Sequence, residues 1–503
     1  MRMLAQEFEA RAAERPWEEA VIDADGTHST GKIWSAAVEL ARTMESVVDG
    51  APTVVVQADN SWRTLVTALA VGRLGGFIAV LSGHATEQEI DLALEDVVPD
   101  VVLASPHTLE TWRLGGKGFT AEAPALDGWT VVARPGATRG VERWNGGAAI
   151  AMTSGSTGRP KCVVQSESAI RFAGQATIDA VGLEPGDRIG AFVPLSSVAA
   201  FCFGMYLPAM LGGAMVCLPR WDPARAIDVI REHQVRWTML VPTMALQFAL
   251  VDGAEGGLAS MRAMTVGGGP MDAGALGRAE QLLGTTFLRV FGMSECLGHT
   301  TPLPTDPPEI RLGRDGRPFP GIEVRVVDEA GAPLPVGELG RAQVKGPSLF
   351  TGYARGGTPA PPDLTPDGFL VTGDLARINE DGTISITGRE KQIIIRGGRN
   401  IDVNEVEAAV AAVPEVVQVC VVPVPDEILG ERAAALVVTA DPGLDLERVK
   451  ARLAADGVPK HQWPEFVFPV PSLPQNRVGK LARNDAVKLA EDLARSAAST
   501  TLN

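Results

Sequence analysis

The most informative stretch of this 503-residue sequence is Thr153-Ser-Gly-Ser-Thr-Gly-Arg-Pro-Lys161. Glycine and small hydroxyl residues let a backbone fold closely around phosphate oxygens, hydroxyl and N–H groups donate to them, and a lysine adds positive charge. The stretch is not a Walker P-loop, because Arg159-Pro160 separate Gly158 from the lysine. It predicts a phosphate-binding loop of another kind. The plain alternative is a Ser/Gly loop without a ligand.

Apolar runs and helical patterns alternate on both sides of this loop. Residues 148–152, directly before it, form an apolar run that predicts a strand. Further upstream, the runs 53–57 and 77–81 enclose a segment with helical apolar spacing, 61–73. A second series extends from about residue 187 to residue 290. Strand–helix–strand alternation at this spacing predicts βαβ units and largely parallel sheets.

The texture changes beyond Gly321, where short strands and turns predict a small β-barrel-like part. An α+β pattern of about 110 residues follows Lys391. We therefore expect an α/β protein in two domains. The large N-terminal domain, residues 1–391, combines parallel-rich α/β subdomains with the small β-rich part, and residues 392–503 form a smaller α+β C-terminal domain.

Composition narrows the range of partners. The chain carries 45 Lys and Arg against 61 Asp and Glu residues, a formal charge of −16. This balance argues against nucleic acid or an anionic membrane surface as the main partner, but not against a small anionic ligand. Residues 198–218 carry no charge, yet Gly212-Gly213 should split them into a buried helix and a strand rather than a membrane span.

The five cysteines and the N-terminus point to a cytoplasmic protein. The cysteines are widely spread and form no CxxC pair, which predicts reduced thiols rather than a zinc site or a disulfide framework. The N-terminal residues are charged and lack the apolar core of a signal peptide.

Further motifs complete the pattern, and in their order along the chain they are highly specific. They are the loop 153–161, Phe291-Gly-Met-Ser-Glu295, Thr372-Gly-Asp374, Gly388-Arg-Glu-Lys391, Gly397-Gly398 and Pro474-Gln-Asn-Arg-Val-Gly-Lys480. Over nearly its whole length the chain resembles the superfamily of adenylate-forming enzymes, which comprises acyl- and aryl-CoA ligases, adenylation domains of peptide synthetases, and luciferases. It looks most like a stand-alone acyl-CoA ligase.

The resemblance implies a reaction in two steps. A carboxylate attacks the α-phosphate of ATP to give acyl-AMP, and a thiol then attacks the acyl-adenylate. Because two anions meet in the first step, positioned cations and N–H donors are central to catalysis. The residues implied in catalysis are Lys480, Glu295, Ser294 and Lys161, with Glu295 as the ligand of Mg²⁺.

The resemblance also assigns binding residues. Asp374 would accept bonds from both ribose hydroxyls, Arg389 would assist there, and the small C-terminal domain would be mobile about a hinge at Lys391. Gly397 and Gly398 would line the channel for the pantetheine arm of CoA. The other residues implied in ATP binding are Thr153, Ser154, Gly155, Ser156, Thr157, Gly158, Gly268, Gly269, Phe291 and Gly292.

The sequence departs from the family pattern at a few positions. Cys162 and Val478 replace a usual glycine and a usual Ser/Thr. Ala200 lies at or near the position of the aspartate that holds the amino group in amino-acid-activating relatives, which argues against an amino acid substrate. His299 and Cys296 flank the Glu295 motif; we favour a packed or solvated histidine and a core thiol over a role in the acid site. None of the departures removes a charged catalytic group.

These observations predict ATP-dependent activation of an apolar carboxylic acid, followed by thioester formation with CoA. ATP, Mg²⁺ and CoA are the expected cofactors, and residues 198–204 with the region around Thr243 are expected to shape the acid pocket. One alternative is a single half-reaction, or transfer to a carrier protein acting in trans. An alternative of another class is an inactive adenylate fold that only binds ligands. A monomer and a homodimer are both compatible with the sequence.

Overall fold

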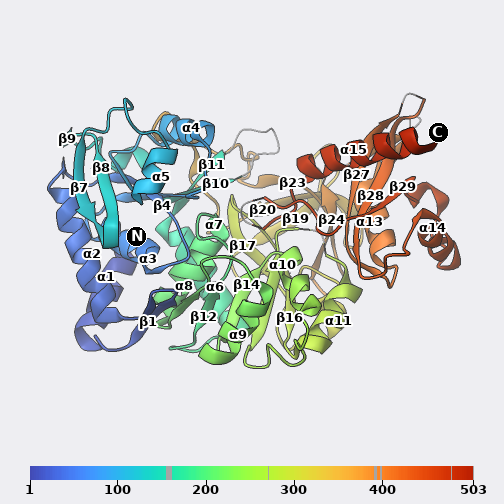
Figure 1. Cartoon of the computed structure of the whole chain (residues 1–503), viewed down its shortest axis with the longest axis horizontal. Coiled ribbons are helices and arrows are strands. Elements are labelled where there is room, and N and C mark those ends of the chain that lie inside the picture. The colour runs from blue at the N-terminus through green and yellow to red at the C-terminus, as the bar shows by residue number, and fades with distance from the viewer. Residues whose placement is uncertain are drawn as a thin grey trace.

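Three β-rich layers and a C-terminal α+β unit follow one another along the molecule (Figure 1). The structure, a computed structural model, describes residues 1–153, 161–269, 271–389, 393–396, 399–426, 428–476 and 479–501. Within them lie two nine-stranded sheets, a four-stranded sheet and a C-terminal sheet. The predicted α/β class is confirmed.

The first nine-stranded sheet has four parallel strands at its centre, β10, β5, β4 and β6, and antiparallel strands on both sides. The run Phe77–Leu81 of β5 is buried at every position, as expected for a parallel strand covered on both faces. In order across the sheet, the strands are β22 (Thr358–Ala360), β21 (Gly352–Arg355), β11 (Lys161–Ser166), β10 (Gly147–Thr153), β5, β4 (Thr53–Gln57), β6 (Val101–Ala104), β8 (Trp129–Ala133) and β7 (Ala121–Ala125).

The second nine-stranded sheet occupies the middle of the molecule, drawn mainly in green (Figure 1). Its central strands are parallel and its edges antiparallel. Its strands, in order, are β18 (Arg317–Pro318), β17 (Cys296–Thr301), β16 (Phe287–Met293), β15 (Ala263–Gly267), β14 (Trp237–Leu240), β12 (Ile189–Ala191), β13 (Met215–Cys217), β1 (Glu19–Asp23) and β2 (Gly26–Ser29).

Helices cover these sheets because their apolar faces pack into two hydrophobic cores. The helix α3 (Trp62–Arg73) begins where Ser61 accepts a bond from the N–H of Arg63, and ten of its positions are buried. The other helices of this part are α1 (Arg2–Glu14), α2 (Thr30–Glu45), α4 (Glu87–Val97), α5 (Pro106–Thr111), α6 (Glu167–Val181), α7 (Val198–Ala200), α8 (Leu207–Leu211), α9 (Pro223–His233), α10 (Pro242–Gln247), α11 (Ala273–Leu283) and α12 (Pro308–Arg311).

The uncharged segment 198–218 folds as predicted. It forms α7, a π-helical turn over Phe201–Tyr206, α8 and then the strand β13. Gly212 ends α8 with a φ of +77°, a left-handed conformation that favours glycine. In the part of the chain that the structure describes, no helix has both the length and the apolar character needed to cross a bilayer.

The small β-rich part is a four-stranded antiparallel sheet, and the C-terminal unit packs helices on a second small sheet. The former consists of β19 (Glu323–Val327), β20 (Leu339–Lys345), β23 (Leu370–Ile378) and β24 (Ile384–Arg389). The latter contains β26 (Arg399–Asp402), β25 (Ile393–Arg396), β28 (Gly430–Thr439), β27 (Val416–Asp426) and β29 (Phe466–Pro469), with the helices α13 (Val403–Ala411), α14 (Leu446–Ala455) and α15 (Arg483–Thr501).

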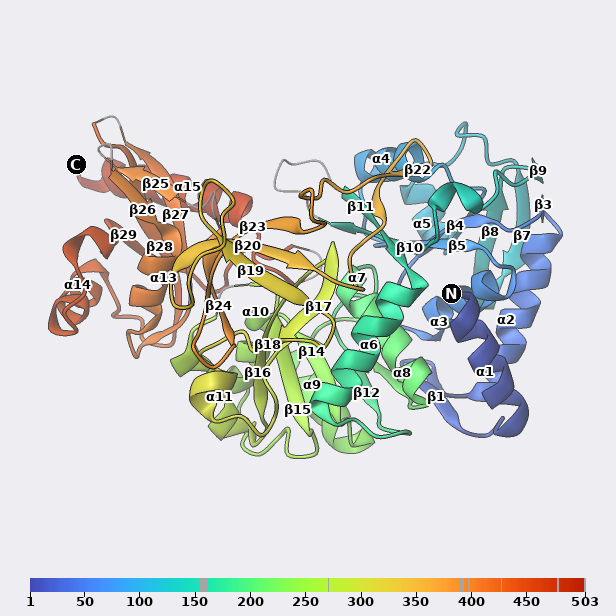
Figure 2. The same ribbon diagram turned by 180° about the vertical axis from the view of Figure 1, so that it is seen from behind.

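The C-terminal unit contacts the middle sheet through the start of α10. The Thr243 hydroxyl donates to the Gly479 carbonyl at 2.7 Å, and the Gln418 amide donates to the Thr243 carbonyl at 3.2 Å. Viewed from behind, the C-terminal unit, drawn in dark orange and red, lies at the end of the molecule opposite to the blue N-terminal elements (Figure 2). The division of the chain at Lys391 stays a prediction, because Lys391 lies outside the described residues.

Candidate active site

The turn between β16 and β17 carries Ser294 and Glu295. Met293 and Cys296 pair across the two antiparallel strands, so Ser294 and Glu295, which lie between them, form the tip of the hairpin. Backbone contacts fix the tip: the Gln165 amide donates to the Ser294 carbonyl at 2.7 Å, and the N–H of Phe350 donates to the Glu295 carbonyl at 2.8 Å. The motif is therefore held by two separate neighbouring segments.

Tyr353 connects Glu295 with Lys161. Its hydroxyl donates to Oε1 of Glu295 at 2.6 Å, and the Lys161 Nζ lies 4.8 Å from the centre of its ring. Burial and the Glu295 carboxylate both raise the pKa of Tyr353, so its hydroxyl remains a donor. One side chain thus contacts two of the charged groups that the sequence predicts for the site.

Asp374 and Arg389 face each other across β23 and β24. The Arg389 Nε lies 3.0 Å from Oδ1 of Asp374. The residue Asp374 is only 3% exposed. Burial raises the pKa of Asp374, and Arg389 opposes this shift. Its second oxygen, Oδ2, is buried without a hydrogen-bond partner in the structure. A buried acceptor of this kind is suited to a ligand hydroxyl.

Lys480 reaches the large part of the molecule from the C-terminal unit. A Cβ atom on Gly268 would lie 3.0 Å from its Nζ and Cε atoms, so the glycine leaves the space that the lysine occupies. Gly268 also has a φ of +84°, in the left-handed region. Burial and the nearby Arg389 lower the pKa of Lys480, whereas Glu295 acts in the opposite direction. The lysine is thus within electrostatic reach of both residues.

The structure therefore brings together four predicted residues that come from separate segments of the chain. They are Glu295, Asp374, Arg389 and Lys480. Phe291 packs edge-on against His299, with ring centres 4.6 Å apart. Thr153 ends β10 and pairs in register with Lys161. Gly292 lies where β16 and β17 approach closely, and Gly269 follows Gly268 after β15. Ser154, Gly155, Ser156, Thr157, Gly158, Lys391, Gly397 and Gly398 lie outside the described residues.

Two contacts of the site were not predicted from sequence. Tyr353 lies 58 residues after Glu295, and Gln165 lies 129 residues before Ser294. Neither stands in one of the motifs quoted above. Their positions follow from the pairing of β11 with β21, in which Val163 faces Tyr353. A pairing between strands so far apart in sequence leaves no local signal.

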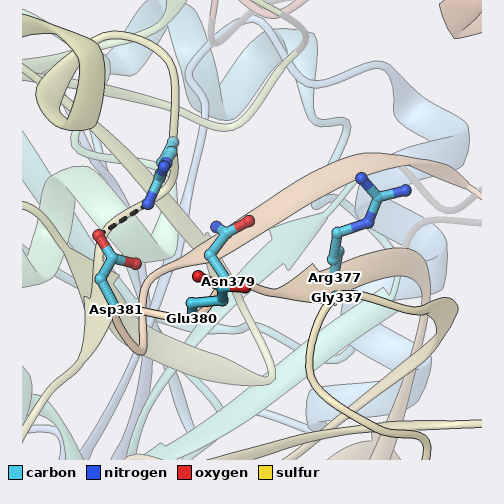
Figure 3. Close-up of a pocket in the computed structure, with 6 residues that line it drawn as sticks. Gly337, Arg377, Asn379, Glu380 and Asp381 are labelled. Atoms are coloured by element: carbon cyan, nitrogen blue, oxygen red, sulfur yellow. Dashed lines mark hydrogen bonds and ion pairs between the residues drawn. The ribbon is translucent and has the colours of Figure 1, made fainter.

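The expected acid pocket, residues 198–204 with the region around Thr243, borders a small cavity at Ala200 and Gly204. A cavity of about 10 Å³ is lined by the residues Gly190, Ala191, Phe192, Val193, Ala200, Gly204 and Met239. It lies beside the π-helical segment, whose side chains are buried. A larger depression of about 370 Å³ contains none of the predicted site residues (Figure 3). Its lining is polar, and there Arg314 donates to Asp381 at 2.7 Å.

Cys296 and His299 are packed in the interior, and both are 0% exposed. The burial of Cys296 is as expected from the sequence, and the burial of His299 shows that the histidine is packed rather than solvated. The Nδ1 of His299 lies 3.1 Å from the Cys296 carbonyl. Because a carbonyl can only accept, Nδ1 carries the hydrogen. Nε2, which is buried without a partner among the described residues, is left as an acceptor. Burial lowers the pKa of His299 to about 4.

This buried histidine makes stability depend on pH. A histidine in the unfolded chain titrates near pH 6.5, so the unfolded state binds the proton more tightly than the folded state does. The stabilising contribution is complete above pH 6.5 and is lost as the pH falls towards 4. We expect the wild-type chain to lose about 3 kcal/mol more unfolding free energy than His299→Asn between pH 7 and pH 4, as measured by urea unfolding.

The matched control is His84→Asn, because His84 is exposed. This control should keep the wild-type pH dependence. Parallel stability curves for the wild-type chain and His299→Asn from pH 4 to pH 7 would contradict the assignment of a buried neutral imidazole.

The comparisons with known proteins agree with this geometry. Residues 8–354 match the AMP-binding enzyme family, and residues 405–480 match the C-terminal domain of AMP-binding enzymes. The chain belongs to the AMP-binding enzymes, the adenylate-forming superfamily that its motifs resemble.

Three similar proteins illustrate the range of this family. A salicylyl-CoA synthase / salicylate adenylyltransferase from a Streptomyces species is 29% identical over 498 residues, covering 92% of this chain and 89% of that protein. Triostin synthetase I of Streptomyces triostinicus is 33% identical over 346 residues, which are 68% of this chain but only 65% of that protein. The crystal structure of ATP-bound MatB from Rhodopseudomonas palustris superposes with a TM-score of 0.83 at 27% identity, covering 97% of this chain and 99% of MatB.

Proposed function

We propose that the protein activates an apolar carboxylic acid as its acyl-adenylate and transfers the acyl group to the thiol of CoA. The observation that carries this proposal is the position of Lys480, which lies against Gly268 and within electrostatic reach of Glu295 and Arg389. A lysine from the C-terminal unit thereby joins groups of the large part in one polar site. The ATP-bound structure of the similar protein MatB supports ATP as the nucleotide.

In the first step, a carboxylate oxygen of the acid attacks the α-phosphorus of ATP. The bond between the α-phosphorus and the bridging oxygen breaks, and pyrophosphate leaves. The Lys480 ammonium reduces the repulsion between the carboxylate and the phosphate in the transition state. Asp374 accepts hydrogen bonds from the ribose hydroxyls through its buried Oδ2. Arg389 keeps the Asp374 carboxylate oriented.

Glu295 provides a fitting ligand for Mg²⁺. Its carboxylate is a hard oxygen donor, and Tyr353 fixes one of its oxygens, which leaves the other for a cation. When bound, Mg²⁺ would neutralise charge that develops on the phosphates. Lys161, on the other side of Tyr353, adds a second positive charge from the chain itself.

In the second step, the thiol sulfur attacks the acyl carbon and AMP leaves with one oxygen of the original carboxylate. Lys480 has to withdraw before a thiol can reach the acyl group. We assign this movement to rotation about Lys391, with Gly397 and Gly398 beside the path of the pantetheine arm. The role of these three residues rests on their sequence motifs.

The apolar surroundings of residues 198–204 support an apolar acid. This segment carries buried aliphatic and aromatic side chains and no charged residue. The salicylyl-CoA synthase makes an aromatic acid a natural first choice among these substrates. The five cysteines are all buried and none forms a disulfide with another, which favours a reducing compartment such as the cytoplasm.

The test measures the two half-reactions separately with a panel of aromatic, alicyclic and medium-chain acids. We expect acid-dependent release of pyrophosphate, and CoA thioester both from the free acid and from preformed acyl-adenylate. Pyrophosphate release without thioester would replace CoA by a carrier protein as acceptor. Thioester from the adenylate alone would leave a single half-reaction. Nucleotide binding with neither product would indicate the inactive fold.

A further inference from the structure

We propose that Tyr353 is a positioning residue that sets Glu295 and Lys161 at a fixed separation around the ATP phosphates. The inference deepens the proposed function and rests on it. The tyrosine hydroxyl orients the carboxylate for Mg²⁺, and the tyrosine ring supports the lysine ammonium.

The first observation is the fixed carboxylate. The Tyr353 hydroxyl lies 2.6 Å from Oε1 of Glu295, a short distance typical of a hydrogen bond to an ionised acceptor. The segment that carries the tyrosine also holds the backbone of the same turn, because Leu349 bridges to Cys296 and the N–H of Phe350 donates to the Glu295 carbonyl. Side chain and backbone are thus positioned by one segment.

The second observation is the seat of the lysine. In the antiparallel pair β11–β21, Val163 faces Tyr353, so Lys161, two residues earlier, projects on the same side of the sheet as its diagonal neighbour. Its Nζ lies 4.8 Å from the ring centre, within the range of a cation–π contact. The Phe350 ring packs on the tyrosine at 4.9 Å and 66°, which holds the ring plane.

These contacts give the phenol two distinct tasks that substitutions can separate. Tyr353→Phe removes the hydroxyl and keeps the ring, whereas Tyr353→Leu removes both. The chain offers a matched control, because it contains only one other tyrosine, Tyr206, whose hydroxyl donates to Oε1 of Glu167 at 3.0 Å. Tyr206→Phe therefore removes a tyrosine–carboxylate bond that is not part of the site.

The experiment measures ATP binding by calorimetry at a series of Mg²⁺ concentrations, with full-length variants. For Tyr353→Phe, we expect the Mg²⁺ concentration that gives half-maximal ATP binding to rise about tenfold, the loss typical of one hydrogen bond to a charged group. For Tyr353→Leu, we expect ATP affinity at saturating Mg²⁺ to fall a further two- to fivefold, roughly the effect of a cation–π contact. Tyr206→Phe should bind as the wild-type chain does.

A second readout needs no substitution at the site. With ¹³C-labelled tyrosine the chain gives two Cζ signals, which the Tyr206→Phe spectrum assigns. We expect Mg·ATP to shift the Tyr353 signal and to leave the Tyr206 signal in place.

Equal Mg²⁺ dependence of Tyr353→Phe and Tyr206→Phe would overturn the role of Tyr353, and so would a Tyr353 signal that ignores Mg·ATP. In both cases the proposed function would stand, since the wild-type chain would still bind the nucleotide. Failure of the wild-type chain to bind Mg·ATP would instead overturn the proposed function and, with it, this inference.

Discussion

Replacing Lys480 by alanine is expected to slow acyl-adenylate formation by about 10²–10³-fold, the usual effect of removing one positioned donor from a developing charge. The reason is that Lys480 is a cation delivered to the site by the C-terminal unit, next to Gly268. Thioester formation from preformed acyl-adenylate should stay within a few-fold of the wild-type rate, because in the proposed mechanism the lysine withdraws before that step. Single-turnover measurements of each half-reaction test this prediction.

The control for this variant is Lys488→Ala. Lys488 also lies in the C-terminal unit, but its side chain is 77% exposed. The Lys488→Ala variant should catalyse both half-reactions at the wild-type rate. Equal losses of Lys480→Ala in the two half-reactions would contradict a role confined to the first step.

The second large effect is expected for Asp374→Asn. The substitution keeps the shape of the side chain and removes the charge that pairs with Arg389 and accepts from the ribose. Because a hydrogen bond to a charged group contributes about 1.5–3 kcal/mol, we expect ATP to bind about 10- to 100-fold more weakly. The readout is the dissociation constant of 2′,3′-dideoxy-ATP divided by that of ATP, which should exceed one in the wild-type chain and fall towards one in the variant.

Asp381→Asn serves as the control here, because Asp381 lies in the turn between the same two strands and bonds to Arg314 instead. It should keep the full preference for the ribose hydroxyls. A variant at Asp374 that still discriminates between the two nucleotides as the wild-type chain does would remove Asp374 from the ribose site.

Local patterns in the sequence predicted most of the fold. The strands Thr53–Gln57 and Phe77–Leu81 occur with the predicted bounds, because apolar spacing and burial agree in these segments. The prediction for the segment 198–218 was also correct, since Gly212 ends the helix in a left-handed conformation that favours glycine. In each case the deciding interactions lie within the segment itself.

The candidate site was predictable residue by residue but not as an arrangement. Asp374 and Arg389 stand in separate motifs, and only the register of β23 with β24 makes them partners. Tyr353 was missed because nothing near it in sequence marks it; strand β21 brings it to Glu295. Pairing between strands that are far apart in the sequence depends on the packing of the whole core. One sequence taken by itself therefore does not reveal it.

The central claim is that a carboxylate attacks the α-phosphate of ATP in the site formed by Lys480, Asp374 and Arg389. The most direct test follows oxygen from an acid labelled with ¹⁸O in its carboxylate, in the presence of ATP and CoA, by mass spectrometry of the nucleotide and phosphate products. The account predicts AMP that carries one ¹⁸O and pyrophosphate that carries none. Label in orthophosphate, or unlabelled AMP formed together with the acyl product, would contradict it.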